Sequence, residues 1–384
     1  MDRVAPVRAA ARGHVRTVAL ACLLIVLGAA AALDMKIWVS DLWRGRSGGD
    51  FAGYYLAALV GRAHGWPGIY DMSLYPPNYE AYLGSPVFGN LPLAAWAALP
   101  FTVLPFHLAD VLWSLLLAAG FVWTWWAATP GLGWERAFLL VAALGAFPVL
   151  FAIHLGQLVL VVGALLVLHV LLLRAGHPLL AGVALGLAFI KPQDVVLLPL
   201  VLLLSGRWKP AATCAATVAV MAAAVLVALG PDGLRGLHAT ADFAIGYQFV
   251  IRHTLGAHLP GWLPQVPVRA ALALVALVPA LAAGARRYER ALTAGVLGAL
   301  LTTPYLNAED FTLLFVCAWL VLSAGASDRF RLGLLVGYPF VAYEQVLGPG
   351  PLLLVELAWL AALAADSLGL TARPMRFPRL ARAR

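Results

Sequence analysis

The sequence predicts an all-α polytopic membrane protein, and three observations support this prediction. Of its 384 residues, 62% are hydrophobic and 11% are charged, whereas soluble domains are about 45–50% apolar and about 25% charged. The mean hydropathy is +0.88. Apolar runs recur from Val15 to Leu370, and because each helical crossing needs about 20 apolar residues, the chain can hold about 12 transmembrane helices. A water-soluble fold is therefore excluded.

The uninterrupted apolar runs are predicted to be the membrane helices. They occupy residues 17–33, 111–129, 136–153, 157–173, 209–230, 268–284, 291–306, 310–325, 331–347 and 351–369. The first run follows several arginines, as a secretory signal would. Leu33-Asp34-Met35 offers no small-x-small cleavage site, so we expect a retained helix, although the alanines at 29–32 leave cleavage as an alternative.

Two further apolar segments are interrupted. Residues 91–107 contain three prolines, which predicts a re-entrant or interfacial segment. Residues 178–206 are broken by Lys191-Pro192-Gln193-Asp194. A single span would place Lys191 and Asp194 near the bilayer centre at a cost of several kcal/mol, so two short helices that meet at this break are predicted instead.

The distribution of charge predicts the orientation. With 12 crossings, most of the 26 Lys and Arg residues lie inside and most of the 18 acidic residues lie outside, as the positive-inside rule requires. The basic segments 1–16 and 371–384 are then cytoplasmic and flank a single transmembrane domain at 17–370. The net charge of +8 indicates contact with membrane lipids rather than with nucleic acid. A multi-pass protein of the plasma (inner) membrane is expected.

Polar segments far apart in the sequence meet on the outer face in this topology. They are the loop at 34–90, which we expect to hold interfacial helices, the corner at 154–157, the break at 191–194 and the segment at 231–267. Asn307, Glu309 and Asp310 lie on the same face. Their convergence favours one shared extracytoplasmic site.

Two acids in the first outer loop are candidates for chemistry. Asp50 begins the amphipathic stretch 49–59, where it is either a helix N-cap or a general base for an acceptor hydroxyl, and the two roles are compatible. Asp71 precedes the turn Tyr75-Pro76-Pro77, and a structural role in that turn is an equal alternative.

Lys191 lies between two apolar half-helices and requires an anion. A phosphate suits this lysine, because the helix that begins at Pro192-Gln193 adds amide donors. The alternative is an internal ion pair with Asp194 or another acid. His154 and Gln157 lie at a corner between two helices and are expected to bind a polar ligand, unless Gln157 caps its helix.

Motifs that are absent from the sequence narrow the possible classes of membrane protein. No G-x-x-x-x-G-K-[ST], G-x-S-x-G or H-E-x-x-H sequence occurs, which argues against a nucleotide-driven pump and common membrane hydrolases. Cys22, Cys214 and Cys317 lie in apolar runs without metal-ligand spacing, and we expect no metal ion and no cofactor. Glu309 and Asp310 begin an apolar run, where either can be an N-cap or a substrate ligand.

A set of short motifs over residues 45–325 resembles glycosyltransferase family 87 of the C-type superfamily. The motifs are Asp50-Phe51-x-x-Tyr54-Tyr55-x-Ala57, Leu74-Tyr75-Pro76-Pro77, Pro92-Leu93, Gly156-Gln157, Ala181-Gly182, Ile190-Lys191-Pro192 and Arg207-Trp208-Lys209. The resemblance implies a C-type bundle that transfers mannose or a related hexose from a polyprenyl-phosphate donor to an envelope glycolipid or glycan, without direct use of a nucleotide sugar. Direct displacement of the phosphate would invert the anomeric carbon.

The resemblance also implies residue roles. Asp50 matches the catalytic base, and Lys191 matches the ligand of the donor phosphate. We expect substrate contacts from Tyr54, Asp71, Tyr75, His154, Gln157, Gln193, Asn307, Glu309 and Asp310. Members of the family often have a histidine in the segment that corresponds to 303–310, which this chain lacks. An inactive family member in envelope assembly therefore stays an alternative. Broken helices with ionisable residues also occur in transporters, so a transporter or lipid flippase is another.

Overall fold

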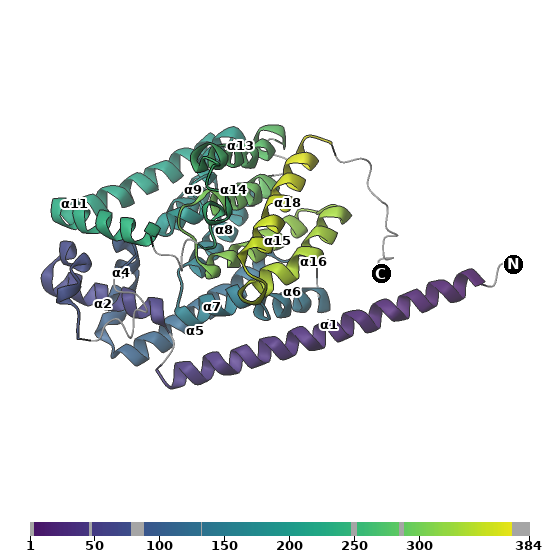
Figure 1. Ribbon diagram of the computed structural model, residues 1–384, viewed down its shortest axis with the longest axis horizontal. Helices are drawn as coiled ribbons and strands as arrows, with labels where there is room; N and C mark the ends of the chain where they lie inside the picture. The colour runs from purple at the N-terminus through teal and green to yellow at the C-terminus, as the bar shows by residue number, and fades with distance from the viewer. Residues whose placement is uncertain are drawn as a thin grey trace.

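The structure is a computed structural model that describes residues 4–45, 48–77, 88–131, 133–246, 252–283 and 288–370. All regular secondary structure within these ranges is helical (Figure 1). The all-α prediction is therefore confirmed for the described chain. The basic tail predicted at 371–384 lies outside the described residues.

Four described helices are long and apolar enough to cross a membrane. They are α5 (Phe106–Ala128), α11 (Trp208–Gly246), α13 (Gln265–Ala283) and α18 (Pro349–Ser367). A fifth candidate is the pair α6 (Trp134–Leu144) and α7 (Phe147–Leu155), which is bent by 67°. These four or five candidates support a polytopic protein, whereas the count of 12 crossings stays a prediction.

The bend between α6 and α7 corrects the single helix expected at 136–153. Gly145 ends α6, and Pro148 occupies the first turn of α7. Proline has no amide hydrogen and disfavours a helical conformation of the residue before it, so a helix starts at proline more readily than it continues through it. Gly145 and Pro148 are therefore the residues from which the bend could have been predicted.

The other apolar helices are shorter than a bilayer crossing. They are α8 (Val159–Arg174), α9 (Pro178–Leu187), α10 (Leu198–Leu204), α14 (Tyr288–Thr302), α15 (Thr312–Ser323) and α16 (Asp328–Ala342). A helix of 15 residues spans about 22 Å, less than the roughly 30 Å hydrocarbon core.

The segment at 178–206 is broken as predicted, whereas a re-entrant or interfacial position of 91–107 stays a prediction. After α9 the chain forms two 3-10 turns, η4 (Ala188–Ile190) and η5 (Pro192–Asp194), before α10 begins. In the proline-rich segment, α4 (Pro92–Ala98) is followed by η3 (Leu99–Val103). Neither segment is a straight crossing.

Helix α1 (Val4–Trp43) runs along the bundle beside α6 and projects beyond it (Figure 1). Its helix continues ten residues into the stretch expected as the outer loop. The loop then forms α2 (Gly49–His64), η1 (Trp66–Tyr70) and η2 (Met72–Leu74). Helix α11 similarly continues past a kink at Gly230 and packs against η1.

Small residues allow the helices to approach closely. A Cβ atom on Gly186 of α9 would lie 2.5 Å from the Thr217 Cβ of α11, a geometry typical of membrane helix pairs.

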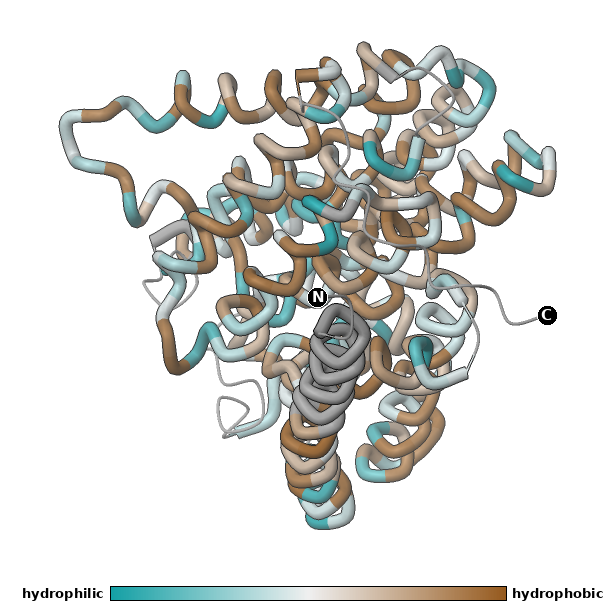
Figure 2. The backbone as a smooth tube through the Cα atoms, turned by 90° about the vertical axis from the view of Figure 1, so that its right-hand side faces the viewer, coloured by the Kyte–Doolittle hydropathy of each residue, from teal (hydrophilic) through white to brown (hydrophobic). Residues whose placement is uncertain are grey.

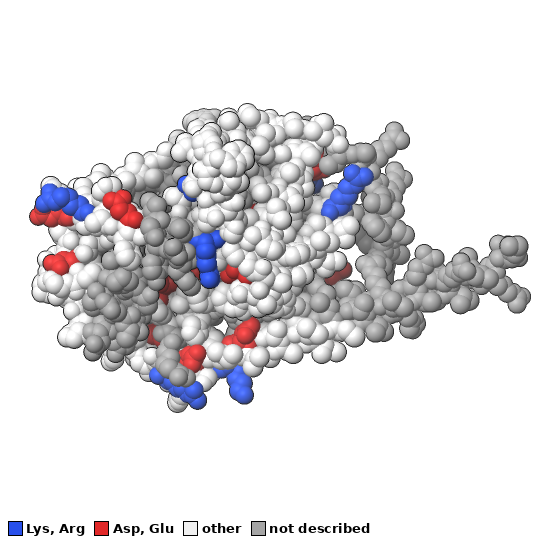
Figure 3. Space-filling model, viewed as in Figure 1, with Lys and Arg blue, Asp and Glu red and all other residues white. Residues whose placement is uncertain are grey.

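Hydrophobic residues dominate most helices, with polar residues toward helix ends and turns (Figure 2). Charged side chains are sparse on the face shown in Figure 3 and gather toward the end formed by α2 and the kinked part of α11.

Candidate functional site

Two glycines with positive φ bring the start of α2 against the corner between α7 and α8. Gly48 (φ 73°) precedes α2 and donates its amide hydrogen to the His154 carbonyl oxygen at 2.7 Å. Gly156 (φ 73°) ends α7, and its carbonyl oxygen accepts a hydrogen bond from Trp113 Nε1 at 2.8 Å. Positive φ is strained for other residues. This geometry places Asp50 beside Gln157.

The Gln157 amide is the centre of a polar network. Its Nε2 donates to Asp50 Oδ2 at 2.5 Å and to Glu309 Oε1 at 2.9 Å. Its Oε1 accepts from the Tyr54 hydroxyl at 3.4 Å. Both amide hydrogens and one lone pair are therefore used, and Gln157 fixes the two carboxyl groups in orientation. It joins segments more than 100 positions apart.

The helix break contributes a cation to the same cluster. Lys191 Nζ forms a buried ion pair with Asp310 Oδ1, and Asp310 Oδ2 accepts the Asn307 amide hydrogen at 3.1 Å. Asn307 and Asp310 form a capping box at η8 (Ala308–Phe311). Asp194 is fully buried, and its carboxylate oxygens have no hydrogen-bond partner in the described chain.

We define the acid–lysine cluster as Asp50, Gln157, Lys191, Asp194, Glu309 and Asp310. Four carboxyl groups surround one lysine. Ionisation of all four would place several like charges close together in a buried site, which is energetically unfavourable. Burial raises the pKa of Asp50 to about 6, against the lowering effects of Lys191 and the Gln157 hydrogen bond. Burial, followed by the charge of Asp310, raises the pKa of Glu309 to about 8. Near neutral pH, Asp50 is mainly ionised and Glu309 mainly protonated.

Access differs among the members of the cluster. Gln157, Lys191, Glu309 and Asp310 are at most 5% exposed, whereas Asp50 is half-buried. Asp194 is also fully buried. Asp50 is thus the most exposed acid of this cluster.

Comparison with protein families decides the class of this chain. The model of glycosyltransferase family 87 matches residues 88–307, which is more than half of the chain. The chain belongs to glycosyltransferase family 87. No match was found among curated proteins or among solved structures. The family match includes Gln157 and Lys191, whereas Asp50 precedes it and Glu309 and Asp310 follow it.

Two of the expected substrate ligands in this family 87 glycosyltransferase have structural partners. Asp71 is exposed and caps η2, because its carboxylate accepts hydrogen bonds from Ser73 N at 3.0 Å and Ser73 Oγ at 2.6 Å. These bonds lower the pKa of Asp71. The Tyr75 hydroxyl donates to the Ile69 carbonyl oxygen at 2.7 Å. The turn interpretation therefore accounts for the contacts of both residues.

Two other expected ligands, His154 and Gln193, form no side-chain hydrogen bond with the cluster within the described chain. His154 is half-buried at the end of α7, and Gln193 is half-buried in η5. The N-cap of α2 is Gly48 and that of η8 is Asn307. Neither Asp50 nor Glu309 is an N-cap, so the capping alternative is wrong for both. Asp310 completes the capping box but is not the N-cap.

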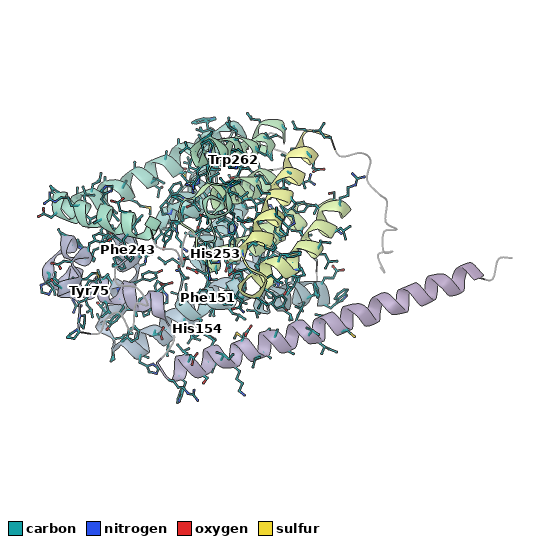
Figure 4. All side chains as sticks on the ribbon, viewed as in Figure 1. Tyr75, Phe151, His154, Phe243, His253 and Trp262 are labelled. Atoms are coloured by element: carbon teal, nitrogen blue, oxygen red, sulfur yellow. The ribbon has the colours of Figure 1, made fainter. Side chains whose placement is uncertain are left out.

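A buried histidine–glutamate pair was not recognised from the sequence. His253 Nε2 lies 3.3 Å from Glu344 Oε2, and each side chain is 1% exposed. The His253 ring packs against Phe311, the residue after Asp310, at 5.8 Å between ring centroids. In Figure 4, His253 lies near the centre of the molecule, above Phe151 and His154 of α7 in this view. The sequence feature that could have indicated this pair is Glu344, a charged residue within the apolar run 331–347.

The site supplies acid–base groups, a cation and hydrogen-bond donors. Among the described residues, no three His, Cys, Asp or Glu side chains are arranged to hold a metal ion. The arrangement can take a proton at Asp50, offer an ammonium hydrogen at Lys191 and, while Glu309 is protonated, offer a carboxyl hydrogen. These functions suit transfer to a hydroxyl group.

Proposed function

We propose that this family 87 glycosyltransferase transfers a hexose, such as mannose, from a polyprenyl-phosphate donor to a hydroxyl group of an envelope glycolipid or glycan. The observation that carries the proposal is the position of Asp50, a reachable carboxylate held by Gln157 beside the buried Lys191–Asp310 pair. A base and a cation for a phosphate are the two groups that such a transfer needs.

In the proposed reaction, Asp50 accepts the proton of the acceptor hydroxyl. At the same time, the oxygen of that hydroxyl bonds to the anomeric carbon of the donor sugar. The bond between that carbon and the phosphate oxygen breaks, and the electron pair leaves with polyprenyl phosphate. Direct displacement inverts the anomeric configuration. General-base catalysis of this kind contributes about 10²–10⁴-fold to the rate.

Lys191 is proposed to bind the donor phosphate while it stays near Asp310. An ammonium group has three hydrogens, so a contact with Asp310 leaves donors that a phosphate can receive. Protonated Glu309 supports this role because it reduces the negative charge that the phosphate meets. Tyr54, Gln193 and Asn307 are proposed to contact the sugar or phosphate around this pair.

We propose 12 crossings of the plasma membrane, with both termini cytoplasmic and the site outside. Gln157 precedes α8, whereas Arg174 ends that helix and pairs with Glu289 at the start of α14. At the same end, Arg290 pairs with Asp366 at the end of α18. The site and this arginine-rich end are therefore separated by about 24 Å along α8. The positive-inside rule favours a cytoplasmic position for the arginines.

A transfer assay tests the proposal. Purified protein in lipid is incubated with radiolabelled polyprenyl-phosphate mannose, and with glucose and arabinose analogues, in the presence of envelope glycolipid. We expect donor-dependent transfer by the wild type, a loss of about 10²–10⁴-fold for Asp50→Asn, and full activity for the matched control Asp71→Asn. NMR of the product should show an inverted linkage.

Three results would contradict the proposal. Full activity of Asp50→Asn would remove Asp50 from the chemistry. A retained anomeric configuration would exclude direct displacement. Movement of labelled donor across the bilayer of a proteoliposome, without transfer of the sugar, would favour the flippase alternative instead.

A further inference from the structure

A second candidate binding site lies away from the acid–lysine cluster. A partly open cavity of about 210 Å³ lies between α1, α6, α15, α16 and α18. Its walls include Leu27, Phe138, Phe315, Trp319, Leu335 and Trp359. None of the cluster residues lines it.

Two of the polar side chains that line this cavity already have hydrogen-bond partners. The Tyr338 hydroxyl donates to the Ala142 carbonyl oxygen at 2.8 Å, and Trp359 Nε1 donates to the Gly333 carbonyl oxygen at 3.0 Å. The interior therefore offers hydrocarbon contact and no free hydrogen-bonding group among these side chains. A cavity of about 150 Å³ lined by Leu, Ile and Phe is known to bind benzene, so this cavity can hold part of an alkyl chain.

Arg331 gives the cavity one charged edge. Its side chain lines the cavity, is exposed, and has no hydrogen-bond or ion-pair partner among the described side chains. Arg331 lies in the first turn of α16. The loop before α16 contains Gly325, whose carbonyl oxygen accepts a hydrogen bond from Arg290. An unpaired cation beside a hydrocarbon-lined space matches a molecule with an anionic head and an apolar chain.

We propose that this cavity binds one alkyl chain of an anionic phospholipid whose phosphate contacts Arg331. A protein helix, about 10 Å across with its side chains, is too wide for a cavity of about 210 Å³. We assign the cavity to a phospholipid rather than to the sugar donor because its charged edge is remote from the cluster. Arg331 and Leu322 both line the cavity, and Leu322 lies near the end of α15 opposite to Thr312, which follows Glu309 and Asp310 of the cluster. Basic pockets between membrane helices commonly bind anionic lipid head groups.

Native mass spectrometry of the full chain tests this site. Delipidated protein is mixed with equal amounts of phosphatidylglycerol and phosphatidylcholine of the same chain length. We expect the wild type to retain phosphatidylglycerol preferentially, and Arg331→Gln to reduce that preference about fivefold. Arg329→Gln is the matched control, because Arg329 is a neighbouring exposed arginine outside the cavity, and it should keep the wild-type preference.

A second variant tests the apolar part of the site. Ala318→Leu adds carbon atoms to the cavity wall and should lower retention of both lipids while leaving Arg331 in place. Inorganic phosphate at the same concentration should not displace the lipid, which separates a lipid from a free anion. Equal effects of the two arginine variants, absence of a preference in the wild type, or unchanged retention in Ala318→Leu would overturn the proposal.

Discussion

The rate of sugar transfer should have a bell-shaped dependence on pH that is set by Asp50 and Glu309. The base must be ionised, so activity should rise with pH through the Asp50 pKa of about 6. Glu309 donates a hydrogen bond only while protonated, so activity should fall as pH rises through its pKa of about 8. At pH 7 each group favours its working form by about ten to one.

The perturbation that isolates one limb of this profile is Glu309→Gln. An amide is neutral at every pH and still donates a hydrogen bond, so the variant should keep activity near pH 7 and lose the alkaline limb. At pH 9 the wild type should retain about one tenth of its optimal activity, and the variant should exceed it. The assay is kcat/KM for labelled donor from pH 5 to pH 9.5.

Two outcomes would refute this reasoning. An alkaline limb that persists unchanged in Glu309→Gln would assign it to another group. An acid limb with its midpoint near pH 4 would show that Asp50 has the pKa of a solvated carboxylate, in conflict with its burial against the cluster. Binding of the donor at each pH, measured separately, provides the control for substrate affinity.

The remaining predictions concern the ion pair and the glycine corner. Lys191→Met should destabilise the protein by about 3–5 kcal/mol because it leaves Asp310 buried and unpaired, and adding Asp310→Asn should restore the melting temperature. If Lys191 binds phosphate, the double variant should regain stability but keep a raised KM for the donor; recovery of both would leave only a structural ion pair. Gly156→Ala should lower the melting temperature and the activity, because a Cβ there would lie 2.8 Å from the Phe51 Cβ in addition to a cost of about 1–2 kcal/mol for positive φ. Gly176→Ala, also at positive φ but with no atom within 4 Å of the added Cβ, should show only the smaller loss of stability, and equal effects would contradict the proposed contact.

The broken helices could be predicted because the physical cause is local. Lys191, Pro192 and Asp194 interrupt an apolar run, and both the cost of charge in hydrocarbon and the geometry of proline act at the interruption itself. Because of this break, the predicted topology has Lys191 and Gln157 on the same face of the membrane. The structure brings both into one cluster with Asp50.

The partners within the cluster could not be predicted from the same signals. The sequence left open whether Lys191 pairs with Asp194 or another acid, and the structure shows Asp310. That choice depends on how η8 approaches η5, which is set by packing between helices more than 100 residues apart. The two contacts of the Gln157 amide depend on this packing too, and so does the pair His253–Glu344.

The continuations of α1 to Trp43 and of α11 to Gly246 have a different cause. Hydropathy indicates where the apolar surface ends, and it was used to place the ends of predicted helices. A helix can continue beyond that point when its polar end packs on other protein, as α11 does against η1. The end of an apolar run therefore does not by itself mark the end of a helix.

The excess of acids in the cluster constrains any role of Lys191 in donor binding. A phosphate that approaches this lysine also approaches Asp310, Asp194 and Glu309, and full ionisation of these acids would repel it. Protonation of Glu309 lowers this repulsion, so the raised pKa that gives the alkaline limb would also support phosphate binding. It follows that Glu309→Gln should leave donor affinity nearly constant across the alkaline range, whereas wild-type affinity should weaken above about pH 8.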